Sequence, residues 1–403
     1  MRYLFVCVTE FQLLSALNIK YHLLMHEDAD ILIRNNHQDD DEIINRIVKT
    51  KLFNNVFFFR HKKEGLHQYI RNTTYHRDGV GFFKAISNDM DMLKNRIMEY
   101  IYGDKYVLAS NVSGNGEFIK NKYDEVFFIT LDPVIKLLLK QIKSINADCK
   151  LNLLDEGTMS YFGYRVEEYI FDSIYLYEPV LSVCYDDNYN FVKIPKIDRT
   201  DESFINLINM VFKWRDIYGQ ELDRSVIFLD QGYQAMPSYL KNPNIITRTI
   251  FANTYRKHFK LAAMYEAEKD WFKKIISWVN IEKYMKFHPR TWYSMKHEFD
   301  DNNINILPNN AIPWEVICSN LHVKNSIFIT INSSSACMYE AVIGRPEDNN
   351  FYILLDQLIQ AKDGFENGLF DRLLKLYPQK LFIPNTEEEL RYVLDSCLLK
   401  IAK

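Results

Sequence analysis

The chain has 403 residues, of which 47% are hydrophobic and 14% aromatic, so two packed domains are expected. The net charge of −4 argues against nucleic acid as the main partner, because duplex-binding proteins are usually basic. The six cysteines form no CxxC pair, so the sequence indicates neither a zinc site nor a disulfide framework.

The sequence also predicts where the protein resides. A reducing cytoplasm is the simplest setting for unpaired cysteines. The opening MRYLFVCVTEF is too short for a signal peptide and is interrupted by Glu10. No apolar stretch reaches the roughly 18 residues of a membrane span. We therefore expect a cytoplasmic protein, while peripheral contact with the inner face of the membrane and a homodimer remain open.

In the first half of the chain, apolar runs alternate with segments of helical periodicity. Strands are predicted at 3–9, 29–35, 55–60, 123–130 and 149–157, and helices at 10–24, 39–53 and 132–145. Pro133 suits the first turn of the last helix, with Asp132 as its cap. This alternation predicts a mostly parallel sheet with helices on both faces.

The second half repeats the alternation. Strands are predicted at 225–232, 283–289 and 304–308, helices at 266–280 and 314–321, and a strand, a serine-rich turn and a helix within 325–346. Gly344 and Pro346 end that last helix. A polar segment around 184–203 separates the halves. We place the domain boundary near residue 190, which gives doubly wound α/β domains at 1–190 and 191–403.

Such sheets bind ligands at the carboxyl ends of their strands, in the cleft between domains. Pro289 lacks an N–H and keeps His288 out of helical geometry, so this imidazole lies at a chain break near Lys286. Four predicted strand ends carry groups capable of chemistry: Asp155-Glu156-Gly157, Asp230-Gln231-Gly232, His288-Pro289-Arg290 and Ser333-Ser334-Ser335.

Each of these strand ends, taken alone, is more often structural than functional. An Asp-Glu-Gly sequence commonly forms a turn, serines before a helix commonly cap it, and His288 alone suits a surface turn. The functional hypothesis depends on the coincidence of all four.

Several of these segments resemble motifs of bacterial sialyltransferases. LLDEGTMSY resembles their acidic motif, KFHPR their His-Pro motif and INSSSACMYE their serine motif. IPWEV resembles the segment that holds the donor ribose, and VTEFQLLSAL is similar to the start of family 52 glycosyltransferases. The motifs occur in the expected order and cover most of the chain.

The resemblance implies a GT-B fold, in which two Rossmann-like doubly wound domains face a central cleft. The N-terminal domain would bind the acceptor and the C-terminal domain the donor, CMP-sialic acid. The implied enzyme is an inverting sialyltransferase that needs no metal or other cofactor. Its acceptor would be a galactoside terminus of a capsular polysaccharide or lipooligosaccharide, and the linkage alpha-2,3.

The resemblance also implies roles for single residues. Glu156 aligns with the acid that acts as base toward the acceptor hydroxyl, while Asp155 would orient the turn. Gly157 permits a tight strand exit on the acceptor side. Some family 52 members place the base after the strand that ends at Asp230, which makes Asp230 the second candidate base. His288 would be the acid that assists the leaving phosphate.

The implied donor site lies in the second half. Lys286 would lie near the nucleotide, and Glu315 would accept hydrogen bonds from ribose hydroxyls. Serine hydroxyls and helix N–H groups can bind phosphate without metal, although which serines do so stays open. The donor-binding set is Lys286, Pro289, Arg290, Glu315, Ser333, Ser334, Ser335, Gln231 and Gly232. Thr9 and Gln12 either cap a helix or line the acceptor side.

Two alternatives remain. Asp89 and Asp91 form a D-x-D pattern that could hold Mg²⁺ or Mn²⁺ in a metal-dependent sugar transferase. A helix cap at Asn88 or Asp89 is the preferred interpretation of this segment. The abundant Tyr and Phe could instead build a non-catalytic glycan- or nucleotide-binding surface. The acidic pair together with His288 favours catalysis, because binding alone needs no matched base and acid.

Overall fold

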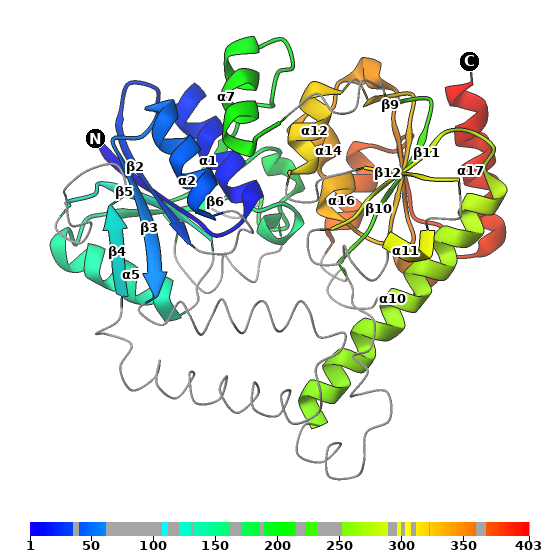
Figure 1. The fold of residues 1–403 in the computed structure, drawn as a ribbon, viewed down its shortest axis with the longest axis horizontal. Helices are drawn as coiled ribbons and strands as arrows, with labels where there is room; N and C mark the ends of the chain where they lie inside the picture. The colour runs from blue at the N-terminus through cyan, green and yellow to red at the C-terminus, as the bar shows by residue number, and fades with distance from the viewer. Residues whose placement is uncertain are drawn as a thin grey trace.

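The computed structural model contains two α/β units that lie side by side (Figure 1). The residues that the structure describes are 1–34, 40–61, 107–111, 121–129, 133–161, 171–185, 189–214, 222–232, 252–288, 296–299, 303–307, 312–321, 323–359 and 368–402. None of the helices in these ranges combines the length and the apolar character that crossing a membrane requires.

The first unit is built on an eight-stranded sheet. Its strands are β1 (Arg2–Cys7), β2 (Asp28–Arg34), β3 (Asn55–His61), β4 (Val107–Asn111), β5 (Glu125–Phe128), β6 (Lys150–Leu154), β7 (Ser173–Leu176) and β8 (Phe191–Lys193). Their order is β4-β3-β2-β1-β5-β6-β7-β8, and every pair is parallel except β3 with β4. Within the described ranges, the helices of this unit are α1 (Glu10–His22), α2 (Asp40–Thr50) and α5 (Pro133–Ile145), with short 3-10 turns at η3 (Thr158–Tyr161) and η4 (Pro179–Leu181).

The second unit is built on a six-stranded sheet that is parallel throughout. Its strands are β10 (Val226–Leu229), β11 (Lys283–Lys286), β12 (Asn305–Ile306), β14 (Ile327–Thr330), β15 (Phe351–Leu354) and β16 (Leu381–Phe382), in the order β12-β11-β10-β14-β15-β16. A separate parallel pair joins β9 (Leu222–Asp223) to β13 (Val323–Lys324).

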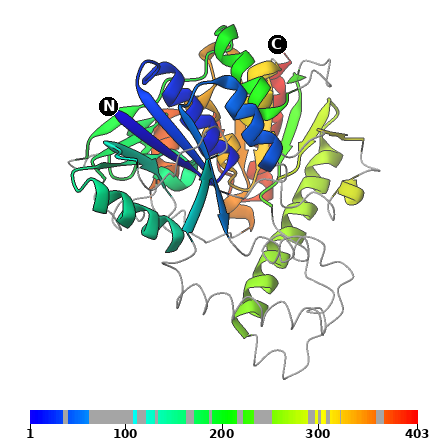
Figure 2. The ribbon, with the colours of Figure 1, turned by 60° about the vertical axis from the view of Figure 1, so that its left-hand side comes forward.

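The described helices of the second half differ in length. The long ones are α7 (Glu202–Phe212), α10 (Ala252–Trp278) and α17 (Glu387–Ile401), and α12 (Trp314–Asn320) and α16 (Leu369–Leu376) are intermediate. The short ones are α11 (Lys296–Phe299), α13 (Ser334–Cys337), α14 (Tyr339–Val342), α15 (Asp356–Ile359) and η5 (Pro346–Asp348). Buried side chains of α10 and α17 form one hydrophobic cluster with the second sheet. The N-terminal end of α10 extends beyond the sheet in both ribbon views (Figures 1 and 2).

The strands form because their sequences are continuous apolar runs. Parallel strands covered by helices on both faces need such runs rather than alternating ones. In β1, the side chains from Leu4 to Cys7 are all buried, and all four residues of β10, β14 and β15 are buried as well. The carboxyl ends of these buried strands are the points from which the chemistry-bearing turns emerge.

The two units are joined by several contacts. β8 is the last strand of the first sheet and lies just past residue 190, where the sequence places the boundary. Beyond it, the backbone N–H of Ile197 donates to Val342 O at 2.9 Å. On α7 and α12, the side-chain amides of Asn209 and Asn320 donate to each other's oxygens at 2.7 Å. These contacts fix the units against each other on the side where α7 and α12 lie in Figure 1.

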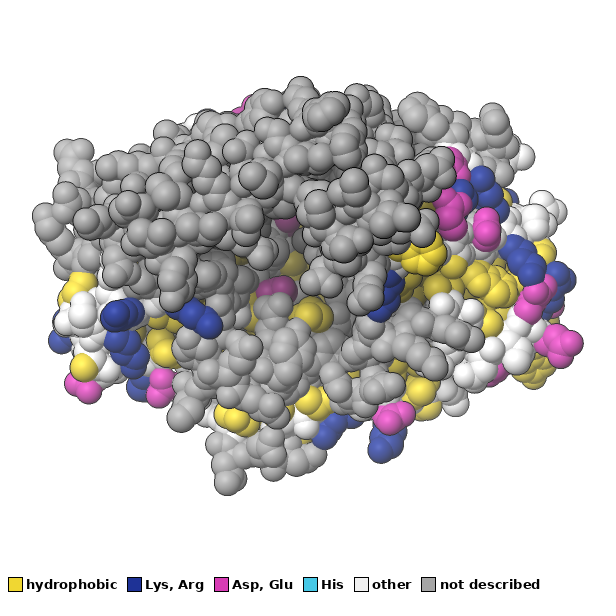
Figure 3. Space-filling model, turned by 90° about the horizontal axis from the view of Figure 1, so that it is seen from below, with side chains coloured by type: hydrophobic (Ala, Val, Ile, Leu, Met, Phe, Trp, Pro, Cys, Tyr) yellow, Lys and Arg dark blue, Asp and Glu magenta, His cyan; other side chains and the backbone are white. Residues whose placement is uncertain are grey.

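The predicted fold class of two doubly wound α/β units is confirmed, because two mostly parallel sheets with helices make up the described part of the chain. The antiparallel strand β4 was not predicted. The surface seen from below carries Lys and Arg side chains among Asp and Glu side chains at both flanks (Figure 3). Charge of both signs is therefore interspersed on the described part of this face.

Candidate active site

The acidic turn after β6 is organised by Asp155. This side chain is fully buried, and its Oδ1 accepts the backbone N–H of Gly157 at 2.7 Å. Its Oδ2 accepts the Tyr161 hydroxyl at 2.7 Å and the backbone N–H of Tyr177 at 3.1 Å. Burial raises the pKa of Asp155 to about 6 despite these donors. Asp155 thus shapes the turn, and its carboxylate is enclosed by the protein.

The neighbouring acid, Glu156, is directed toward α1. Its Oε2 accepts a hydrogen bond from Nε2 of Gln12 at 2.8 Å, and its backbone N–H donates to Ser160 Oγ at 2.7 Å. Gln12 is fully buried at the start of α1, where Thr9 caps the helix by accepting the backbone N–H of Gln12 at 3.3 Å. Thr9 and Gln12 therefore form a capping box, and Gln12 reaches from the cap to the carboxylate that the sequence nominates as base.

The acidic turn touches the serine turn of the second unit. Gly157 has φ +89°, and a Cβ added to it would lie 2.9 Å from Cβ of Ser334. Ser333 caps α13, with its Oγ accepting the backbone N–H of Ser335 at 3.3 Å. All three serines are partly exposed. Two strand ends that are far apart in sequence are thus in van der Waals contact.

His288 is held by the turn that follows β10. Its backbone N–H donates to Oδ1 of Asp230, a side chain that is 3% exposed. Gly232 has φ +72°, and a Cβ added there would lie 2.6 Å from Nδ1 of His288. Asp230 and Gly232 therefore fix the backbone and the ring of His288, respectively.

Gln231 connects this turn to the serine turn. Its backbone N–H donates to Oε1 of Glu268 at 3.1 Å. Its side-chain amide lies 3.3 Å from Thr330 Oγ1 and against the backbone N–H of Ser333. The acidic turn, the serine turn and the turn that holds His288 consequently form one connected group of residues.

Two buried charged groups, Lys286 and Glu315, lie beside this group. Burial lowers the pKa of Lys286 to about 8, opposed by the charges of Asp230, Glu315 and Glu10. Burial raises the pKa of Glu315 to about 7, which Lys286 counteracts and Asp155 reinforces. Since Asp155 and Glu10 belong to the first unit, the charges of both units act on each other here.

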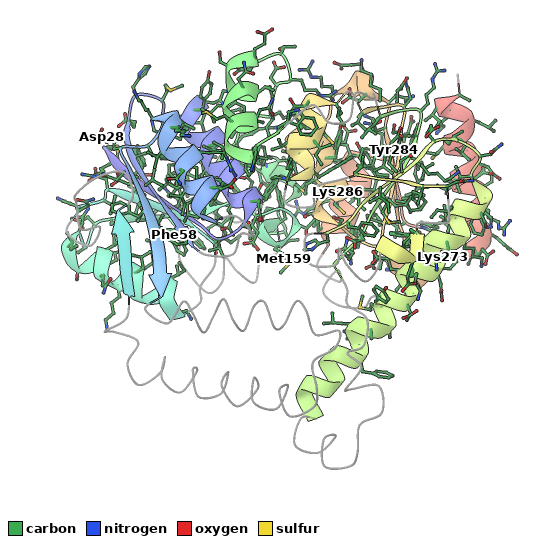
Figure 4. The ribbon with its side chains drawn as sticks, in the orientation of Figure 1. Asp28, Phe58, Met159, Lys273, Tyr284 and Lys286 are labelled. Atoms are coloured by element: carbon green, nitrogen blue, oxygen red, sulfur yellow. The ribbon has the colours of Figure 1, made fainter. Side chains whose placement is uncertain are left out.

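The view with side chains places this group near the junction of the two units. Met159, which follows the acidic turn, and Lys286, which ends β11, both lie there (Figure 4). The candidate site is therefore composite, with the acidic turn from the first sheet and the histidine, lysine and serines from the second.

Some predicted residues lie outside the described part of the chain. These are Pro289, Arg290, Asp89 and Asp91. Within the described ranges, no three His, Cys, Asp or Glu side chains are grouped so that they could hold a metal ion. Metal independence stays a prediction.

Glu268 is a buried acid at the site that sequence reasoning missed. It is 0% exposed, and burial together with the charge of Asp230 raises its pKa well above the usual range. A signal for it exists in the sequence. Glu268 follows Tyr265 by three residues and precedes Phe272 by four, which places it on the buried face of α10.

Comparison with solved structures finds chains to which this one is similar at low identity. An alpha/beta-galactoside alpha-2,3-sialyltransferase from the luminous marine bacterium Photobacterium phosphoreum is 10% identical, with 95% of this chain and 98% of that chain covered and a TM-score of 0.49. A sialyltransferase from Photobacterium damselae is 10% identical, with 95% and 99% covered and a TM-score of 0.42. A glycosyltransferase from Rickettsia africae is also 10% identical, with 99% and 88% covered and a TM-score of 0.42.

The sequence comparisons gave no match. No family model matches the chain, and no curated protein matches it significantly. Substrate and mechanism must therefore be argued from the residues of the site.

Proposed function

We propose that the protein is an inverting, metal-independent sialyltransferase. In this proposal it moves sialic acid from CMP-sialic acid to the galactose terminus of a surface glycan, a capsular polysaccharide or a lipooligosaccharide, in alpha-2,3 linkage. The observation that carries the proposal is the contact between the acidic turn and the serine turn, Gly157 against Ser334, with His288 held in the same group. A base, an acid and phosphate-binding hydroxyls are needed together for this reaction.

The reaction is a direct displacement. Glu156 takes the proton of the acceptor hydroxyl, whose oxygen attacks the anomeric carbon of sialic acid from the face opposite the phosphate. The bond from that carbon to the phosphate oxygen breaks, and its electron pair leaves with CMP. His288 gives a proton or a charged hydrogen bond to the phosphate. Two of the hydroxyls of Ser333, Ser334 and Ser335 bind the same phosphate oxygens.

The two candidate bases differ in their surroundings, and the difference favours Glu156. Asp230 is buried and already accepts the backbone N–H of His288, which suits a residue that positions the acid. Glu156 is only partly buried and lies on the first unit, opposite the serine turn. We therefore assign the acceptor base to Glu156.

The donor side of the proposal depends on Lys286 and Glu315. Lys286 is buried with its pKa lowered to about 8, and a bound anionic nucleotide would raise that pKa and offset the cost of burying the charge. Glu315 is 8% exposed at the start of α12 and would accept hydrogen bonds from ribose hydroxyls.

The test is incubation with CMP-sialic acid and a panel of galactosides, in EDTA and with added Mg²⁺ or Mn²⁺, followed by linkage analysis of the product. The proposal expects an alpha-2,3-sialylated product at the same rate in EDTA. Transfer that requires added metal would support a metal-dependent transferase instead. Binding of CMP without turnover on any acceptor would identify a non-catalytic binding protein.

A further inference from the structure

Gln12 occupies a position that joins the start of α1 to the proposed base. Its Oε1 accepts the backbone N–H of Val8 at 2.6 Å and that of Thr9 at 3.4 Å. Its Nε2 donates to Oε2 of Glu156 at 2.8 Å. Because the oxygen faces two N–H donors, the backbone sets the orientation of the amide, and the NH₂ group must face Glu156.

The choice of glutamine at this position has a chemical reason. The third residue of a helix capped by threonine is commonly Glu or Gln, since either can accept the N–H of the cap residue. Glutamate would also interact favourably with the helix dipole. Glutamate has no donor, however, and would place a second carboxylate against Glu156. Glutamine at position 12 can serve the cap and the carboxylate together.

Glu156 is thereby held from two sides. Its backbone is fixed by its own N–H donating to Ser160 Oγ at 2.7 Å, within the turn that Asp155 shapes. Its side chain is fixed by the amide of Gln12, which is 0% exposed. A hydrogen bond from a buried donor is stronger than one in water, and donation to a carboxylate favours its charged form.

We infer that Gln12 is a positioning residue that aims the carboxylate of Glu156 at the acceptor hydroxyl and holds it in the form that accepts a proton. The catalytic consequence rests on the proposed function. Among the described residues, Asp155 lies on the same turn, and α1 also carries Glu10 in its first turn and Lys20 and His22 in its last turn. In the second unit, Lys286 and Glu315 interact electrostatically with Glu10 and Asp155, respectively. The variants below leave all of these unchanged.

The test compares Gln12→Met with Gln12→Glu in the full chain. Both variants should move the acid limb of the kcat/KM profile for sialyl transfer to higher pH, with the larger shift for Gln12→Glu, because its carboxylate repels that of Glu156. The value of kcat should fall about tenfold or more, while KM for CMP-sialic acid stays near that of the parent.

Ala16→Gly is the matched control. Ala16 is buried one turn further along α1, and glycine there weakens the helix. This variant should lower the midpoint of urea unfolding but leave the acid limb in place. An acid limb that moves equally in Ala16→Gly would show that Gln12 acts only by stabilising α1, and would overturn the inference.

A second readout is independent of activity. With ¹³C-labelled glutamate carboxyls, the resonance of Glu156 is identified by its loss in Glu156→Gln, and its titration midpoint is followed by NMR. The midpoint should rise in both Gln12 variants, and unchanged midpoints in both would overturn the inference. A parent that transfers no sialic acid would overturn the proposed function instead, while a raised midpoint would still support control of Glu156 by Gln12.

Discussion

Replacing Gly232 with alanine should displace the imidazole of His288 without removing it. The added Cβ would lie 2.6 Å from Nδ1 and 2.8 Å from Cγ of the ring. Ordinary van der Waals contact begins at 3.4 Å, so the ring must move by 3.4 − 2.6 = 0.8 Å. The backbone of His288 is held by Asp230, and the side chain must therefore take up most of this movement.

The expected magnitude follows from that displacement. Misplacing a reacting group by about 1 Å can cost on the order of 10²-fold in rate. The positive φ of Gly232, +72°, adds a backbone cost of roughly 1–2 kcal/mol to any residue with a Cβ. Gly232→Ala should thus lower kcat for sialyl transfer about 10²-fold and lower the free energy of unfolding by about 1–2 kcal/mol.

Gly368→Ala is the matched control for the assay. Gly368 has φ +78°, and an alanine Cβ there would meet nothing within 4 Å. Both variants should lose similar stability in urea unfolding, while only Gly232→Ala should lose turnover at saturating CMP-sialic acid. Equal transfer rates in the two variants would refute the reasoning that Gly232 sets the place of the imidazole.

Three further predictions concern charged groups at the site. His288→Ala should lower turnover by roughly 10²–10⁴-fold, which is the usual scale for losing an acid catalyst. The loss should be smaller with a donor whose leaving group needs no protonation. Lys286→Met should weaken CMP binding in calorimetry yet raise the midpoint of urea unfolding at pH 7. Because the pKa of Lys286 is lowered to about 8 in the folded state, the parent loses this penalty as pH rises, and the stability gain of the variant should shrink between pH 8 and pH 10.5. A gain that stays constant with pH would contradict burial of the charge. Glu268→Gln keeps an acceptor for the backbone N–H of Gln231. Since the pKa of Glu268 is raised in the folded state, the parent loses stability as pH rises above the usual glutamate pKa, and the free energy of unfolding of the variant relative to the parent should increase from pH 5 to pH 9. An equal difference in unfolding free energy at the two pH values would refute this.

Much of the fold could be predicted because its parallel strands are continuous apolar runs. β10 and β14 lie within predicted strands, and β1 begins at Arg2, one residue before its predicted strand. α5 begins at Pro133, as its cap pattern indicates. The helix predicted at 266–280 is α10, which starts at Ala252; the buried stripe that gives the apolar periodicity runs from Tyr265 to Ile276. β4, Val107–Asn111, was missed because its short sequence mixes apolar and small polar residues and its antiparallel pairing depends on β3.

The candidate site could be predicted only at the level of strand ends. The topology rule indicates that turns after parallel strands lie near one another, and the contact of Gly157 with Ser334 joins two of them. The bond from Gln12 to Glu156 could not be predicted, because the capping pattern around Thr9 accounts fully for a glutamine at this position. Pairings across 144 residues depend on tertiary packing, which local pattern does not encode.

The central claim is that Glu156 acts as base toward a galactoside acceptor in sialyl transfer from CMP-sialic acid. The most direct measurement is the transfer rate of Glu156→Gln beside that of Asp230→Asn, with donor affinity determined for both by calorimetry. Glu156→Gln keeps the size of the side chain and should lose most of the transfer while binding the donor as the parent does. Asp230→Asn retains an oxygen that can accept the N–H of His288 and should lose less. Transfer that survives in Glu156→Gln and disappears only in Asp230→Asn would contradict the account.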